Sequence, residues 1–143
     1  MASTVDIPGI AARVLASIAM VWQSVWLAEW WRYFASHDGS IGSFAYLVEG
    51  FALSLGVTIY IWSGPWSQRV ADVSWGAAGA LAGFAFASGF SIGATLVPSA
   101  LAFFFAMAVA DTRAGLRTER GIAFALLAAV VQVAVMLGLA RLT

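Results

Sequence analysis

Reactive and charged side chains are scarce in this sequence. The chain of 143 residues contains no cysteine, no lysine and a single histidine, His37, and charged residues make up only 10% of it. Without cysteine, the chain cannot form disulfides, thiolate metal sites or iron–sulfur clusters, and one histidine cannot supply both axial ligands of a bis-histidine haem. The net charge is zero, so nothing indicates a nucleic-acid partner. We therefore expect no metal site and no nucleic-acid interface.

Hydrophobic residues dominate what is present, at 62% of the chain. A soluble domain carries about 25% charged residues, so this composition predicts an integral membrane protein. The first apolar stretch, 14–31, contains four tryptophans and is longer than the roughly 7–15 residues of a signal-peptide core. We expect it to be a retained transmembrane helix.

Apolar segments long enough to cross a membrane occur along the whole sequence. A helix needs about 20 mostly apolar residues to cross the hydrocarbon core, and its backbone must satisfy its own hydrogen bonds there. Turn residues or charges separate the segments. The sequence therefore predicts an all-α bundle of about five transmembrane helices in one membrane domain, 1–143. The expected spans are 9–34, 42–62, 72–91, 95–112 and 120–141.

The middle of the chain allows more than one arrangement. Residues 73–110 form one apolar run, interrupted only by Gly89, Gly93 and Pro98. At about 1.5 Å per residue, this run is long enough for two crossings of a core of about 30 Å if the turn is tight. A re-entrant pair of half-helices is the alternative, and a single span followed by a surface helix is disfavoured by the arginine distribution.

The arginines predict an orientation, because cytoplasmic loops are enriched in basic residues. With five spans, most of the arginines fall on one side of the membrane, which predicts a cytoplasmic N-terminus and an outside C-terminus. Arginine without lysine, together with much alanine, suggests a bacterial cytoplasmic (inner) membrane. The larger group is Arg13, Arg69, Arg113, Arg117 and Arg120, and the smaller is Arg32 and Arg141.

Small residues recur at helical spacing on the third span. Gly79, Gly83, Ala87 and Ser91 follow one another every four residues, and such a stripe lets helix backbones approach closely. Shorter series begin at Gly50 on the second span and at Gly121, followed by Ala125 and Ala129, on the fifth. We expect helix–helix contacts there, either within the chain or between subunits.

Glu49 is the strongest candidate for an ion or proton site, because it lies well inside the second span. An acidic residue at a helix centre costs about 3 kcal/mol, so we expect Glu49 to face the bundle interior and to be hydrogen-bonded. Gln23, Gln132 and Ser54 are its candidate partners. Such a group could bind a transported ion, or it could be polar glue between helices.

Two surface features complete the candidates. Trp22, Trp26 and Trp30 recur every four residues on the first span and could contact a lipid, quinone or pigment ring, although a stripe of this kind also suits acyl chains. The last cytoplasmic connection carries a basic patch expected to face lipid headgroups. The patch is Arg113, Arg117 and Arg120, with Asp111 and Glu119 beside it. Arg69 and Asp72 are expected to form a local exposed pair.

The sequence contains no phosphate-binding loop, zinc-protease motif or nucleophile elbow. It therefore predicts a non-catalytic small subunit of a larger membrane complex, of respiratory, photosynthetic or transport type. A small homo-oligomeric ion or proton channel or transporter that uses Glu49 is the alternative, and a membrane enzyme is less favoured than either. No cofactor is indicated beyond a bound lipid, quinone or pigment. The expected partners are the lipid bilayer and either other membrane subunits or copies of the chain.

Overall fold

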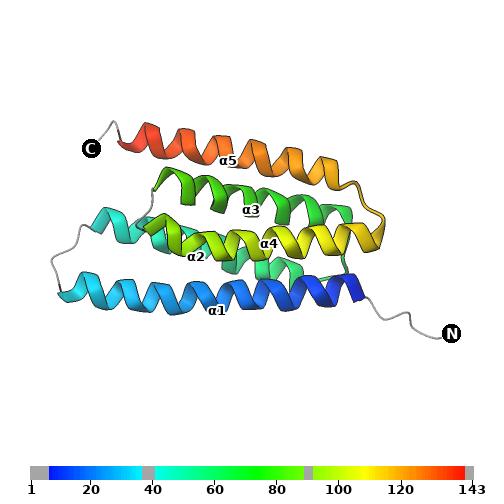
Figure 1. Cartoon of the computed structure of the whole chain (residues 1–143), viewed down its shortest axis with the longest axis horizontal. Coiled ribbons are helices and arrows are strands. Elements are labelled where there is room, and N and C mark those ends of the chain that lie inside the picture. Colours follow the sequence, from blue (N-terminus) through cyan, green and yellow to red (C-terminus); the bar gives the residue numbers. More distant parts are fainter. Residues whose placement is uncertain (1–6, 37–40, 89–91, 141–143) are drawn as a thin grey trace.

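The computed structural model describes residues 7–36, 41–88 and 92–140, whose regular structure is entirely helical (Figure 1). Four helices are long and apolar enough to cross a membrane, over Gly9–Ser36, Gln68–Ala87, Gly93–Asp111 and Thr118–Gly138. The predicted all-α class is therefore confirmed, and the build is that of a helical membrane protein. The five helices are α1 (Ile7–Ser36), α2 (Ile41–Trp62), α3 (Gln68–Ala87), α4 (Ile92–Ala114) and α5 (Thr118–Ala140).

The apolar run 73–110 folds into two antiparallel helices, α3 and α4, which pack side by side (Figure 1). They are 20 and 23 residues long, so neither is a half-helix, and Gly93 and Pro98 lie inside α4. Helix α3 begins earlier than the expected residue 72, because the Ser67 hydroxyl caps it by accepting a hydrogen bond from the Val70 amide at 3.4 Å.

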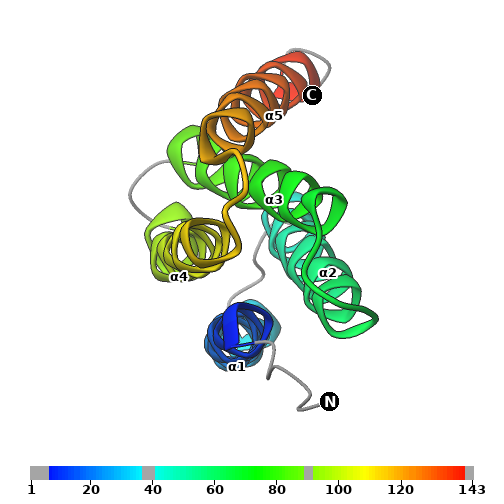
Figure 2. The ribbon, with the colours of Figure 1, turned by 90° about the vertical axis from the view of Figure 1, so that its right-hand side faces the viewer.

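Helices α1 to α4 surround a common core, and α5 packs on the outer side of α3 (Figure 2). Of an 18-residue apolar stretch of α3, 61% is buried inside the chain, whereas only 17% of the corresponding stretch of α5 is buried. Helix α3 is therefore the central element, and α5 exposes most of its leucines and valines. The start of α1 and the end of α5 lie at opposite ends of the bundle (Figure 1).

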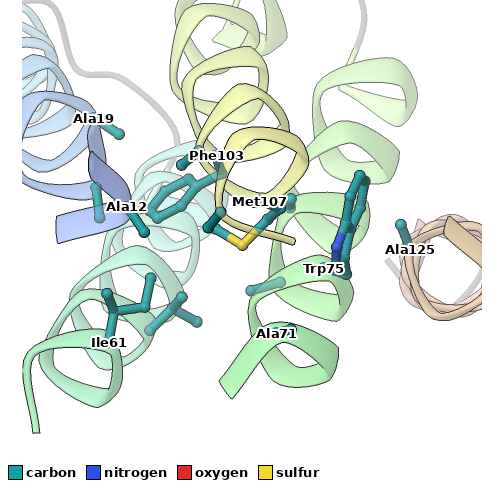
Figure 3. Packing of buried hydrophobic residues seen from close by; sticks show 14 of the residues in the cluster. Ala12, Ala19, Ile61, Ala71, Trp75, Phe103, Met107 and Ala125 are labelled. Carbon is teal, nitrogen blue, oxygen red and sulfur yellow. The ribbon is translucent and has the colours of Figure 1, made fainter. Parts of the chain in front are cut away.

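The core pairs a small-residue face with bulky side chains. Ala12, Ala16 and Ala19 give α1 a flat buried face. Phe103 and Met107 of α4, both fully buried, point into the space between α1, α2 and α3 (Figure 3). The volume that the alanines leave open is thereby filled, as close packing requires.

The turn between α4 and α5 separates the three arginines of the predicted basic patch. Gly115 adopts φ 66°, a conformation that favours glycine, and the Leu116 amide donates to the Asp111 carbonyl at 3.0 Å, which ends α4 in a Schellman motif. Arg113 lies in the last turn of α4, Arg117 in the connection and Arg120 in the first turn of α5. The three arginines therefore belong to two helices and the connection between them.

Candidate functional site

The glycines of α3 lie directly against α5. A Cβ atom built on Gly79 would overlap the backbone of Ala125, and one built on Gly83 would lie 2.6 Å from the Ala129 carbonyl oxygen. Real Cβ atoms do not approach other atoms this closely, so only glycine allows the two helices to meet at this separation. The small-residue faces of α3 and α5 therefore contact each other within one chain.

The other small residues have different surroundings. A Cβ on Gly50 would make ordinary contact with Leu96, at 3.7 Å. Ala87 is half-buried, and Ser91 lies outside the described residues. Gly121 is covered by the indole ring of Trp75, which would collide with any side chain at that position. Gly121 thus leaves room for the Trp75 ring between α3 and α5 (Figure 3).

Trp75 also binds a buried carboxylate. Its Nε1 donates to Oδ2 of Asp111 at 2.6 Å, and the Nε1 of Trp66, in the connection before α3, donates to Oδ1 at 3.2 Å. Asp111 is fully buried, so the expectation that it faces headgroups beside the basic patch is wrong. Two donors from two segments satisfy a carboxyl group that would otherwise be costly to bury.

A second carboxylate adjoins this group. Asp72 accepts a hydrogen bond from Gln68 Nε2 at 2.9 Å and forms an ion pair with Arg120 at 3.0 Å. The predicted pairing of Asp72 with Arg69 is therefore replaced by a contact between α3 and α5. We call Asp111 with its two indole donors the Asp111 clasp; together with the Asp72–Arg120 pair it ties α4 and α5 to α3 and to the connection before α3.

Sequence reasoning missed the Asp111 clasp, although the sequence holds a signal for it. Asp111 follows Phe103 and Met107 at spacings of four, so all three occupy one face of α4. Since that face is the most deeply buried side of the helix, a carboxylate on it needs donors from neighbouring segments.

Glu49 pairs with Gln132, but on the outside of the chain. Gln132 Nε2 donates to Glu49 Oε1 at 3.4 Å, and the two residues line a small hollow together with Ala80 of α3. Glu49 is exposed, so the expectation that it faces the interior of the bundle is wrong for the single chain. The expected partnership with Gln132 is present.

Gln23 and Ser54 lie inside the bundle instead, away from Glu49. Gln23 is 3% exposed and Ser54 is fully buried. Trp62 Nε1 of α2 donates to Ser17 of α1 at 3.3 Å, which fixes the antiparallel register and places Gln23 and Ser54 at a similar level. Among the described residues, neither the Gln23 amide nor the Ser54 hydroxyl has a hydrogen-bond partner.

Replacing Gln23 by methionine is expected to raise the free energy of unfolding by about 1–3 kcal/mol, because it removes a buried unsatisfied amide while nearly keeping its volume. Thermal unfolding in detergent measures this effect. Gln132→Met is the control: it removes the surface bond to Glu49 and should not stabilise the chain. A loss of stability in Gln23→Met would contradict the prediction.

The tryptophan face of α1 is partly engaged in packing. Trp22 Nε1 donates to the Thr95 carbonyl of α4 at 2.9 Å, and its ring centroid lies 6.0 Å from that of Trp26. Further along the helix, the Trp30 ring lies 5.7 Å from that of Phe34. Trp22 thus joins α1 to α4, and contact of this face with a lipid, quinone or pigment ring stays a prediction.

Apolar hollows flank the C-terminal half of α3. One of about 570 Å³ lies between α3 and α4, and one of about 450 Å³ lies between α3 and α5. They share Ala82 and Phe86, and their linings are almost wholly hydrocarbon. Surfaces of this chemistry suit the acyl chain of a lipid.

No protein-family model, curated protein or solved structure matches this chain. Within the described part of the chain, no three histidine, aspartate or glutamate residues are grouped to hold a metal ion. Two features stand out, namely the buried Asp111 clasp and the exposed Glu49–Gln132 pair.

Proposed function

We propose that this chain is a non-catalytic, membrane-embedded subunit of a larger membrane complex. The exposed Glu49–Gln132 pair carries the proposal. Acidic residues within transmembrane segments almost always face protein or water, because exposure to lipid is costly. Glu49 lies exposed on apolar helix α2, two turns from its first residue, so a second protein that covers it would remove this cost.

The remaining surface supports the same proposal. Helix α5 packs on α3 and leaves large aliphatic side chains uncovered, among them Leu126, Leu127 and Val130. This surface suits lipid or further subunits. With the arginine distribution, the proposed orientation has the start of α1 on the cytoplasmic side of a bacterial inner membrane and the end of α5 outside.

Native mass spectrometry of protein extracted gently from its own membranes tests this proposal. We expect the 15.0 kDa chain to appear in stoichiometric complexes with other subunits. A chain that is only monomeric under these conditions would contradict the proposal. Complexes found only at multiples of 15.0 kDa would instead support the homo-oligomeric alternative.

The alternative is a homo-oligomeric ion or proton channel or transporter, favoured by the same exposed carboxylate if copies of the chain place it along a shared pathway. Glu49→Gln separates the two functions in proteoliposomes, with Gln132→Met as a control for loss of the hydrogen bond alone. Our proposal predicts that proton and cation flux stays at background for the wild type and both variants. Flux in the wild type that Glu49→Gln abolishes would support the channel.

A further inference from the structure

We propose that the chain binds one two-chain membrane lipid, with an acyl chain on each side of the Phe86 ring. The site consists of the two apolar hollows beside the C-terminal half of α3. We call them the α4-side hollow, of about 570 Å³, and the α5-side hollow, of about 450 Å³. Phe86 lines both hollows and is 83% exposed, so its ring stands between them on the outer surface.

The two hollows arise because α4 and α5 pack on either side of α3 and barely touch each other (Figure 2). Helix α3 therefore forms the floor of both hollows, and Ala82 and Phe86, one turn apart, are the residues that they share. The outer walls are formed by α4 on one side, with Val97 and Leu101, and by α5 on the other, with Val130. These three wall residues are exposed, so both hollows open to the surroundings of the bundle.

The length of the hollows matches one leaflet of a bilayer. The wall on α4 extends from Ala94 to Phe104, about 15 Å at 1.5 Å per residue, and the wall on α5 extends from Ala129 to Leu137, about 12 Å. One leaflet supplies about 15 Å, half of a hydrocarbon core of about 30 Å. A transmembrane helix needs about 20 residues and is twice as long as either hollow. The hollows therefore fit the acyl chains of one leaflet better than a helix of a partner protein.

Both hollows are closed toward the middle of the bundle. The ring centroids of Phe104 and Trp75 lie 5.7 Å apart, so these two rings close the α4-side hollow. Gly83 and Ala129 bring α3 and α5 into backbone contact at the base of the α5-side hollow. The other ends of the hollows lie at the first turn of α4 and the last turn of α5, at the same end of the bundle (Figure 1). Two acyl chains can therefore enter side by side from one membrane surface.

The chemistry of the lining selects the acyl chains rather than the headgroup. All residues that line the two hollows are alanine, glycine, valine, leucine or phenylalanine, so binding rests on close packing against hydrocarbon. Two chains joined by one glycerol act as a bivalent ligand, because the first chain to bind holds the second beside the other hollow. A single-chain lipid lacks this gain. The geometry therefore favours a diacyl phospholipid.

Native mass spectrometry of the full chain in mild detergent, titrated with lipid, tests the proposal. The probes are dioleoylphosphatidylcholine and its single-chain analogue, oleoyl-lysophosphatidylcholine, which carry the same headgroup. We expect the wild type to bind one molecule of the two-chain lipid, and to bind it about tenfold more tightly than the lysolipid, since detergent that competes for each hollow reduces the gain from linkage.

Variants that fill one hollow at a time give the sharper test. Ala94→Phe fills the α4-side hollow and Ala134→Phe fills the α5-side hollow, and both alanines are exposed, so the fold should tolerate the larger side chains. Each variant should bind the two-chain lipid only as weakly as the lysolipid, whereas the affinity for the lysolipid should stay unchanged, because one hollow remains open.

Ala52→Phe is the matched control, because Ala52 is an exposed alanine of α2 outside both hollows, and it should leave both affinities unchanged. Any preference of the detergent for one of the lipids is common to all variants and cancels in the comparison. Equal affinity of the wild type for the two lipids would overturn the proposal. A loss in only one of the two filling variants would also overturn it, because a single chain would then occupy a single hollow.

Discussion

Gly79→Leu is expected to force α5 away from α3 and to lower the free energy of unfolding by about 3 kcal/mol, the upper part of the usual range for overpacking. The Ala125 backbone already occupies the space of the new side chain. Backbone cannot move aside as a flexible side chain can, so the helices must separate. Unfolding in mixed micelles of increasing SDS content, followed by tryptophan fluorescence, measures the loss.

Gly76→Leu is the matched control, because Gly76 lies on the same helix and a Cβ there meets nothing within 4 Å. It should be neutral or stabilising, since glycine is a poorer helix former than leucine. Gly79→Ala gives a sharper test. Helix propensity alone predicts a gain of about 1 kcal/mol, whereas the contact predicts a loss. Equal stability of the Gly79 and Gly76 variants would show that the α3–α5 contact is looser than described.

The contact between α3 and α5 could be predicted only in part from the sequence. The spacing of Gly79 and Gly83 indicated a packing face, and the spacing of Gly121, Ala125 and Ala129 indicated another. That the two faces meet within one chain could not be deduced, because a small-residue face fits any other equally well. The choice depends on loop lengths and on the remaining helices, which bring α5 onto the outer side of α3.

The five helices were easier to predict than the directions in which their polar side chains point. Apolar length requires a spanning helix whatever its neighbours, so all five helices were expected. The sequence also predicted Gln132 as a candidate partner of Glu49, and the two side chains are hydrogen-bonded. Because an acidic side chain is costly in lipid, Glu49 was expected to face the interior of the bundle. That expectation holds only for a chain that has no protein partner. Ser54, Val57 and Ile61 take the buried side of α2 and turn Glu49 outward.

Charges near helix ends gave the least reliable predictions. The expected fourth span, 95–112, ends just after Asp111, and a charge at the end of an apolar run usually meets water. The Schellman turn at Gly115 extends α4 beyond Asp111, so the carboxylate stays on the buried face below Met107. Recognising this required the positions of Trp66 and Trp75, which are distant in the sequence.

The Asp111 clasp should therefore be the second large contribution to stability. Asp111→Leu is expected to lower the free energy of unfolding by about 3 kcal/mol, because it leaves two indole N–H groups without their acceptor and an unpaired buried donor costs about 1–3 kcal/mol. Asp72→Asn, at the more exposed ion pair with Arg120, should cost no more than about 1 kcal/mol. Unfolding in mixed micelles compares the two variants.

Combining the substitutions tests whether hydrogen bonding causes the loss. If unpaired donors are the cause, adding Trp75→Phe to Asp111→Leu should cost much less than Trp75→Phe alone, because the donor it removes has already lost its acceptor. Double-mutant cycles of contacting residues give coupling energies of about 0.5–3 kcal/mol. Strict additivity would show instead that Asp111 and Trp75 act independently. A loss in the double variant that is smaller than the sum of the two single losses would identify the Asp111–Trp75 hydrogen bond as a contact that holds α3 and the end of α4 in one arrangement.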